Sequence, residues 1–266
     1  MIPKAYIDAW RSVAPWIESS QVEQDLVISR AIVEIFSNEF LKEHLAFRGG
    51  TALHKLFLHP QARYSEDIDF VQLKPGPAKP LLEARRDQLL FLGGKDDRQV
   101  KLNEHNCTVY YQFETEVSPP PRMRVKLEIN TREHFHVLDL QKETFEVDNP
   151  WYKGSAEVTT YQPEELLGTK LRALYQRKKG RDLFDLYYAL EKLDLDVDKI
   201  IECFHAYIQK EENNAPTVRE FELNLEVKML DEEFTGDITA LLRPEIDYDQ
   251  EEAQKLISNE IISKLN

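Results

Sequence analysis

Hydrophobic and polar positions repeat with two different periods along the chain. Between residues 98 and 130, apolar side chains recur at every second position, which is typical of half-buried strands. The clearest strand is "RMRVKLEIN", with Val125, Leu127 and Ile129 on one face and Arg124, Lys126, Glu128 and Asn130 on the other. After "EVTTYQP", at residues 157–163, the apolar spacing becomes helical. The pattern therefore predicts an α+β chain with a domain boundary near residue 160, dividing 1–160 from 161–266.

Helices are expected on both sides of these strands. Ser20 and Glu23 have the spacing of a capping box, and a long helix is predicted to follow. One face of that helix would carry Val22, Leu26, Val33, Phe36 and Phe40. The prolines and glycine of residues 75–80 predict a loop, followed by a helix that ends near Gly93.

The second domain is predicted to begin with a helix whose first residue is Pro163. Leu167, Leu171 and Leu174 form its apolar face, and Arg177, Lys178 and Lys179 are placed in its last turn. Gly180 would end this helix, and Asp182 and Asp185 would open the next one.

The segment "AFRGGTALHKLFLHPQARYSEDIDF", residues 46–70, contains two further elements of interest. A strand is expected to end at Phe47 and to pass into a helix at the glycine pair. "DIDFVQL" is predicted to be a strand, and its period of two places Asp67 and Asp69 on one face.

Composition indicates a globular protein: 42% of the residues are hydrophobic and 10% aromatic. The most apolar stretch, "DLVISRAIVEIF", is broken by Ser29 and Arg30, and the N-terminus lacks a secretion signal. Cys107 and Cys203 form no CxxC pair, as expected for a reduced compartment. We therefore expect a cytoplasmic protein that does not enter a membrane.

The net charge of −14 is distributed unevenly, which bears on possible partners. Residues 1–180 carry 26 acidic and 25 basic residues, whereas residues 181–266 carry 22 acidic and 9 basic residues. Nearly all the excess acid therefore lies in the last third of the chain. A polyanionic substrate is compatible with the first two thirds, and the acidic part faces either solvent or a basic partner.

Asp67 and Asp69 are the strongest candidates for metal ligands. Two ionised carboxylates side by side repel each other unless a cation lies between them, and oxygen ligands of this kind suit Mg²⁺. The same motif is also found on polar strand faces exposed to water, and in glycosyltransferases. By itself, therefore, the pair does not identify the chemistry.

The glycine pair points to phosphate binding. Gly49, Gly50 and Thr51 lie where a strand passes into a helix, where backbone N–H groups and the helix dipole favour an anion and Thr51 adds a hydroxyl. An ordinary strand–helix turn remains the alternative. The sequence contains neither GxxxxGK[ST] nor GxGxxG, so the usual nucleotide-binding loops are absent.

Two more residues extend the candidate site. Glu128 would complete a metal site or accept a proton, although a cross-strand salt bridge with its basic neighbours would equally explain it. Lys170 stands in a leucine-rich helix, where a lysine is suited to clamp a phosphate.

Taken together, "FRGGTALHK", "RYSEDIDF", "VKLEIN" and "GTKLRALYQRKKGRDLFDLYYAL" resemble the AbiEii/MenT group of nucleotidyltransferase-like toxins. The resemblance covers roughly residues 22 to 195. It implies a minimal nucleotidyltransferase fold, a small mixed sheet with helices, followed by a helical domain. It also implies the toxin of a toxin–antitoxin or phage-defence system, and some members of the group transfer nucleotides to the 3′ end of tRNA.

The resemblance assigns roles to residues at matching positions. Gly49, Gly50, Thr51 and Lys55 correspond to the phosphate-binding glycine motif, and Arg63 and Ser65 belong to the signature of the aspartates. Asp67 and Asp69 correspond to the metal-binding pair, Glu128 to a third carboxylate, and Lys170 and Asp182 to the lysine and aspartate of the helical motif. Thr51 replaces the serine of many relatives and keeps the hydroxyl.

The expected activity is therefore Mg²⁺-dependent transfer of a nucleotide from a nucleoside triphosphate, with tRNA as the acceptor and a cognate antitoxin as a possible partner. Two alternatives remain at this point. In the first, the chain transfers the nucleotide to a protein or a small molecule and not to tRNA. In the second, the chain is a non-catalytic module that binds nucleotide or antitoxin.

Overall fold

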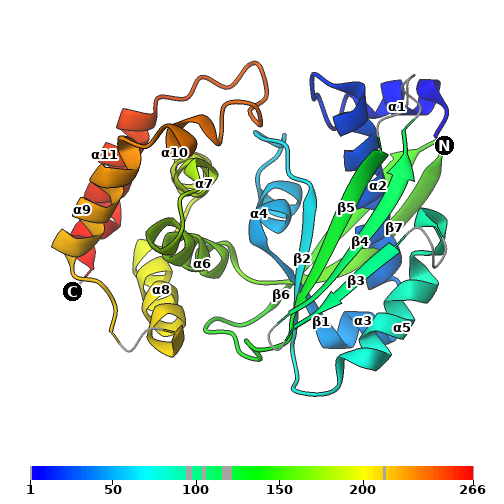
Figure 1. Ribbon diagram of the computed structural model, residues 1–266, viewed down its shortest axis with the longest axis horizontal. Coiled ribbons are helices and arrows are strands. Elements are labelled where there is room, and N and C mark those ends of the chain that lie inside the picture. The colour runs from blue at the N-terminus through cyan, green and yellow to red at the C-terminus, as the bar shows by residue number, and fades with distance from the viewer. Residues whose placement is uncertain (1, 94–97, 104–105, 116–121, 212–213, 266) are drawn as a thin grey trace. The chain divides into compact units, whose positions relative to one another are not determined.

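A computed structural model describes residues 2–93, 98–103, 106–115, 122–211 and 214–265 (Figure 1). The chain forms two compact units. The first, which we call the strand unit, comprises Met1–Phe135 and Leu140–Tyr161, and the second, the helical unit, comprises His136–Asp139 and Gln162–Asn266. The α+β class predicted from the sequence is confirmed.

The strand unit contains a seven-stranded mixed sheet in the order β3-β4-β5-β2-β1-β7-β6. Its strands are β1 (Leu45–Arg48), β2 (Asp67–Gln72), β3 (Arg98–Leu102), β4 (Asn106–Glu114), β5 (Arg122–Asn130), β6 (Gln141–Asn149) and β7 (Tyr152–Thr160). β2 pairs with β5 in parallel and with β1 in antiparallel orientation, so β2 is a central strand.

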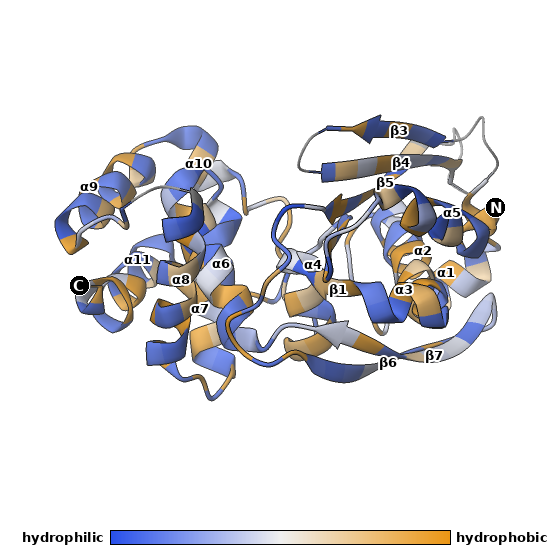
Figure 2. Ribbon diagram, turned by 90° about the horizontal axis from the view of Figure 1, so that it is seen from below, coloured by the Kyte–Doolittle hydropathy of each residue, from blue (hydrophilic) through white to orange (hydrophobic). Residues whose placement is uncertain are grey.

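Helices of the strand unit pack against this sheet, and α2 contacts β5, β6 and β7. Figure 2 shows the strands β3–β5 and the hairpin β6–β7 on either side of α2. The helices are α1 (Lys4–Trp10), α2 (Ser19–Phe36), α3 (Glu39–His44), α4 (Gly49–Ala52), the π-helical turn Leu53–Phe57, α5 (Ala78–Gln88) and the 3₁₀ turn Leu90–Leu92.

The alternation in β2 and β5 has the predicted effect on burial. Ile68 and Phe70 are buried on one face of β2, while Asp67 and Asp69 are half-buried on the other. The apolar face of β5 is likewise buried, through Val125, Leu127 and Ile129. Burial of the apolar face leaves the carboxylates of both strands on the opposite face.

The helical unit packs α6 (Pro163–Gln176) against α7 (Gly180–Lys192) and α8 (Val197–Glu211). Its other helices are α9 (Val218–Met229), α10 (Glu232–Gly236), α11 (Gln250–Glu260) and the 3₁₀ turn Ile262–Lys264. Pro163 is in the first turn of α6, as predicted, and Leu167, Leu171 and Leu174 are buried.

Several predicted boundaries are wrong. The N-cap of α2 is Glu18, which makes no side-chain cap, so Ser20 lies inside the helix and the capping box is absent. The helix ends at Phe36, and Phe40 belongs to α3, where it is exposed. Pro80, assigned to a loop, lies in the first turn of α5, because a proline is tolerated where no intrahelical N–H bond is required.

The end of α6 also differs from the prediction. This helix ends at Gln176, and Arg177, Lys178 and Lys179 lie between α6 and α7 and not in a last helical turn. Gly180 begins α7 and does not end α6. All three basic residues form ion pairs with acidic residues of the helical unit, which explains their position outside the helix.

The sequence pattern did not indicate the hairpin of β6 and β7. Half-buried and exposed positions alternate along most of both strands, but the half-buried positions hold few apolar residues. Val147 and Val158 are buried, and α2 packs against both strands. The segment "SPPPR", residues 118–122, is also expected to connect two strands tightly, but it begins outside the described residues.

Candidate functional site

The turn from β1 into α4 places a glycine against the acidic strand. Arg48, the last residue of β1, is paired with Asp69 of β2, and Gly49 follows with a φ of +80°. A Cβ atom on Gly49 would lie 2.7 Å from Asp69 Oδ2. Glycine is required here for two reasons: L-residues avoid this backbone conformation, and any side chain would collide with the carboxylate. The structure therefore brings the glycine turn and Asp69 together.

The parallel pairing of β2 and β5 brings the third predicted carboxylate to the same place. Asp69 is paired with Glu128 and Asp67 with Lys126, and the polar faces of both strands coincide. The Lys126 ammonium is 3.1 Å from Glu128 Oε2 and 3.5 Å from Asp67 Oδ2. We call Asp67, Asp69, Lys126 and Glu128 the strand cluster.

Burial and the neighbouring carboxylates both act on the pKa of Asp69. Burial raises this pKa to about 6, and the charges of Asp67 and Glu128 add to the rise, while Lys126 and Arg48 oppose it. Burial also acts to lower the pKa of Lys126, but the surrounding carboxylates outweigh it, so that this pKa is raised. Negative charge is therefore in excess, and the cluster favours a cation.

The donor chemistry of the cluster fits a hard divalent cation. Mg²⁺ is commonly held by one or two carboxylates together with substrate phosphates, and Asp67 and Asp69 provide two carboxylates beside the glycine turn. Among the described residues, no three His, Cys, Asp or Glu side chains are grouped closely enough to hold a metal by themselves. The role of Glu128 as a third ligand beside Asp67 and Asp69 stays a prediction.

Thr51 and Ser65 connect the glycine turn to the acidic strand. The buried Thr51 hydroxyl donates to the Asp67 carbonyl, and its oxygen is 2.8 Å from Ser65 Oγ. Because a hydroxyl has a single proton, Thr51 in this arrangement positions Asp67. Its predicted contact with a phosphate stays a prediction.

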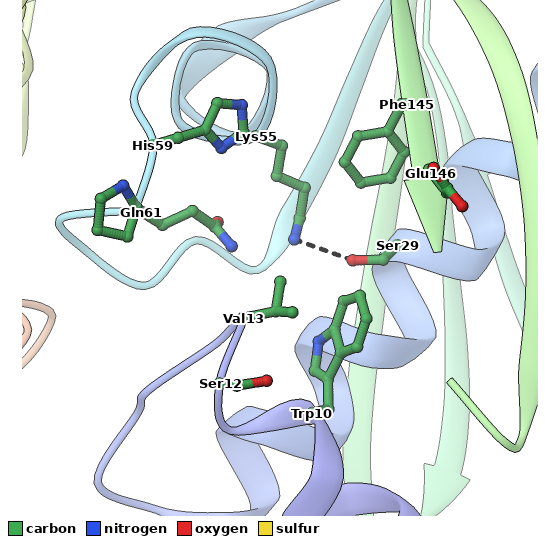
Figure 3. Close-up of a pocket in the computed structure, with 10 residues that line it drawn as sticks. Trp10, Ser12, Val13, Ser29, Lys55, His59, Gln61, Phe145 and Glu146 are labelled. Atoms are coloured by element: carbon green, nitrogen blue, oxygen red, sulfur yellow. Dashed lines mark hydrogen bonds between the residues drawn. The ribbon is translucent and has the colours of Figure 1, made fainter. Parts of the chain in front are cut away.

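Lys55 lies in a buried cluster of its own. Its ammonium donates to Asp25 Oδ2 at 2.9 Å and to Ser29 Oγ at 3.1 Å, and the indole N–H of Trp10 donates to Asp25 Oδ1 at 3.0 Å. Lys55 also lines a cavity of about 240 Å³, next to Trp10 and Gln61 (Figure 3). These contacts give Lys55 a structural role, and its nucleotide-binding role stays a prediction.

Arg63, the other basic residue of the aspartate signature, is also buried. Its guanidinium donates to the carbonyl oxygen of Tyr64 at 3.0 Å, and only 2% of the residue is exposed. This contact lets Arg63 support the segment that leads into β2, and its predicted role in nucleotide binding stays a prediction.

Lys170 and Asp182 meet within the helical unit. The Lys170 ammonium is 2.9 Å from Asp182 Oδ1 and 2.8 Å from Asp185 Oδ2, and Arg177 Nε is 2.7 Å from Asp182 Oδ2. Burial acts to raise the pKa of Asp182, but Lys170 and Arg177 outweigh it and lower this pKa. We call Lys170, Arg177, Asp182 and Asp185 the helix cluster, and its contribution to the site stays a prediction.

Sequence reasoning did not assign a role to Lys126 in the site. It appeared only as a basic neighbour of Glu128, on the same strand face. The register that places it opposite Asp67 depends on the pairing of β2 with β5. The spacing of Lys126 and Glu128 was the available signal, because a period of two places both on one face.

Comparisons with known proteins identify the family of the chain and show a similar fold. The family described as "Nucleotidyl transferase AbiEii toxin, Type IV TA system" matches residues 30–256. Among solved structures, the nucleotidyltransferase toxin MenT4 from Mycobacterium tuberculosis H37Rv has a TM-score of 0.69 at 17% identity, over 100% of this chain and 91% of that chain. An antigenic nucleotidyltransferase-like protein from Paracoccidioides brasiliensis has a TM-score of 0.41 at 19% identity, over 71% of this chain and 89% of that chain.

A search of curated proteins gave no match. Among the described residues, no helix combines the length and apolarity needed to cross a membrane. The family match extends over both units, and the likeness to MenT4 shows a nucleotidyltransferase-like fold. The chain therefore belongs to the AbiEii family of nucleotidyl transferase toxins of type IV toxin–antitoxin systems.

Proposed function

We propose that the chain transfers a nucleoside monophosphate from a nucleoside triphosphate to an acceptor hydroxyl, in a Mg²⁺-dependent reaction at the glycine turn and the strand cluster. The acceptor oxygen forms a bond to the α-phosphorus, and the bond to the β-phosphate breaks with release of pyrophosphate. The observation that carries the proposal is the close approach of Gly49 to Asp69. It places an anion-binding turn directly beside the carboxylates, as a metal-bound polyphosphate requires.

The residues of the strand unit have distinct roles in this reaction. Backbone N–H groups of Gly49, Gly50 and Thr51 bind the phosphates at the start of α4, and Asp67 and Asp69 would hold Mg²⁺. When bound, Mg²⁺ neutralises phosphate charge and polarises the phosphoryl oxygens. Glu128 either adds a ligand or accepts the proton of the attacking hydroxyl. Ser65 supports Asp67 through Thr51.

We propose that Lys170 and Asp182 of the helical unit take part in nucleotide binding. The family resemblance supports this role, and the ion pairs of the Lys170 ammonium with Asp182 and Asp185 would orient it. A lysine held in this way is suited to contact a phosphate once a ligand draws it from its partners. Lys55 and Arg63 would then act by supporting the elements that carry the site, through their buried contacts.

We propose tRNA as the acceptor, modified at its 3′ end, in a cytoplasmic toxin that stops translation and limits phage infection. Membership of a toxin family supports an essential cellular target. The near balance of 26 acidic and 25 basic residues over positions 1–180 supports access by a polyanion. A cognate antitoxin is the expected partner of such a toxin.

The test is transfer of label from each of the four α-³²P-labelled nucleoside triphosphates to total cellular RNA. Wild-type protein should label a tRNA band in Mg²⁺ and not in EDTA, and Asp67→Ala/Asp69→Ala should label nothing. Asp148→Ala is the matched control, because this aspartate is exposed and belongs to the β6–β7 hairpin. Transfer at the wild-type rate by the double variant would refute the proposed reaction.

The same experiment separates the possible acceptors. Label in protein or in a small molecule, with none in RNA, would keep the reaction and replace tRNA as the acceptor. Binding of nucleotide with no labelled product in any fraction would instead indicate a non-catalytic module.

A further inference from the structure

Lys126 occupies the position of a cation among the carboxylates of two strands. Its ammonium lies 3.1 Å from Glu128 Oε2 on its own strand and 3.5 Å from Asp67 Oδ2 on β2. Asp69, opposite Glu128 in the ladder, also acts electrostatically on Lys126. One positive charge therefore pairs with a carboxylate of β2 and a carboxylate of β5.

The neighbouring Arg48 pairs with a carboxylate outside the strand cluster. Arg48 is paired with Asp69 in the sheet, but its guanidinium forms an ion pair with Glu133. Glu133 is held in turn through its backbone N–H, which donates to Asn130 Oδ1 at 2.9 Å. Lys126 itself makes direct ion pairs with two carboxylates of the strand cluster.

Lys126 is able to leave this position. Its side chain is 27% exposed, so the ammonium reaches water, and a lysine carries its compact charge on a flexible four-carbon stem. An ion pair exposed to this degree is weak, and a divalent cation brings twice the charge to the same oxygens.

We propose that Lys126 is a tethered counter-ion, which holds Asp67 and Glu128 in the nucleotide-free protein and is displaced when a divalent cation binds. This inference rests on the proposed function, because it assumes that the strand cluster is the metal site. Lys126 is thus a positioning residue: it keeps the carboxylates assembled without metal and opposes metal binding until nucleotide phosphates contribute ligands of their own.

The lysine has two measurable effects under this proposal. Without it, the carboxylates repel one another in metal-free buffer, so the protein loses stability that a divalent cation restores. A divalent cation also binds more tightly, because no ammonium has to be displaced from the carboxylates. Loss of a residue that only stabilised the fold would lower the stability in metal-free buffer and leave the affinity for the divalent cation unaffected.

The experiment is titration of the full-length, nucleotide-free protein with Mn²⁺, followed by electron paramagnetic resonance of the unbound ion. Lys126→Met should lower the Kd by at least about tenfold, since removal of a like charge next to the ligands is a strong effect. Lys126→Arg keeps the charge and should bind as the wild type does. Lys153→Met is the matched control, because it removes a lysine that pairs with Asp148 in the same unit.

Thermal denaturation supplies the second measurement. The rise in Tm on adding Mn²⁺ should be larger for Lys126→Met than for the wild type and for Lys153→Met. Mn²⁺ binding by Lys126→Met that is equal to or weaker than binding by the wild type would overturn the proposal. The absence of Mn²⁺ binding to both the wild type and Lys126→Met would also overturn it. Neither result depends on nucleotide transfer, so a failure here is distinguishable from a failure of the proposed reaction, which the labelling experiment measures.

Discussion

The strand cluster and the helix cluster are both groups of lysine and aspartate, but they differ in charge balance and burial. In the helix cluster, Lys170 and Arg177 face Asp182 and Asp185, and both aspartates are fully buried. In the strand cluster a single lysine faces three carboxylates, and the side chain of Asp67 is 40% exposed. The helix cluster is balanced in charge and its aspartates are buried, whereas the strand cluster has an excess of acid and its Asp67 is partly exposed.

The difference shows how each cluster contributes to the molecule. Buried charges are tolerated when each has a partner, so the balanced cluster can stabilise the packing of α6 against α7. An excess of negative charge costs stability unless a cation neutralises it, so the strand cluster is suited to binding. Substitutions of aspartate should therefore have opposite effects on stability in the two clusters.

The largest effect is expected for Asp182→Ala in the helix cluster. This change removes the carboxylate that accepts from both Lys170 and Arg177 and leaves the Lys170 ammonium buried beside Asp185 alone. The free energy of unfolding should fall by about 3 kcal/mol. Urea denaturation would measure it, with Asp194→Ala on the exposed surface of the same unit as the control. A loss no larger than that of the control would show that the cluster is not structural.

The next effect concerns the contact between the glycine turn and Asp69. Gly49→Ala must adopt a positive φ and displace Asp69 Oδ2, which should cost about 2 kcal/mol of stability and abolish nucleotide transfer. Gly76→Ala is the control, because its added Cβ would lie 3.5 Å from Gln72 Nε2, an ordinary contact. Thermal denaturation and the labelling assay measure the two consequences. Nucleotide transfer by Gly49→Ala at the wild-type rate would show that the glycine turn is not required for the reaction.

A smaller effect should follow the loss of the Thr51 hydroxyl. Thr51→Val keeps the shape of the side chain but leaves the Asp67 carbonyl without this donor, which should cost about 1 kcal/mol. Thr51→Ser retains the hydroxyl and should restore most of the stability. The two variants are compared by urea denaturation. Equal stability of the valine variant and the wild type would contradict the positioning role of Thr51.

The smallest effect is expected for Asp69→Asn, and it is a gain in stability where the other variants lose stability. Because the pKa of Asp69 is raised to about 6 in the folded protein, stability falls as pH rises from the ordinary aspartate pKa through 6. Asp69→Asn should therefore raise Tm by a few degrees at pH 8 in metal-free buffer, and the gain should disappear towards pH 4. Differential scanning calorimetry at both pH values checks this. A lower Tm for Asp69→Asn at pH 8 would refute the excess of negative charge.

The sequence predicted the elements that carry the site because their side-chain periods are clear. Ile68 and Phe70 alternate with the aspartates, and Val125, Leu127 and Ile129 alternate with Lys126 and Glu128, so one face of each strand had to be buried. The hairpin of β6 and β7 has few apolar residues at its half-buried positions, and its periodicity was therefore too weak to read. The prediction for Arg177 was wrong for a different reason. Arg177 lies outside the predicted last helical turn, where its guanidinium pairs with Asp182.

By itself, the sequence determined the α+β class, the strand faces that carry Asp67, Asp69 and Glu128, and the resemblance to the AbiEii group. These properties follow from local periodicity and from motifs that lie within short segments. Only the tertiary structure decided which residues meet: Gly49 against Asp69, Lys126 between Asp67 and Glu128, and Lys55 against Asp25. The reason is physical, because strand order and register are set by long-range pairing, which no local pattern encodes.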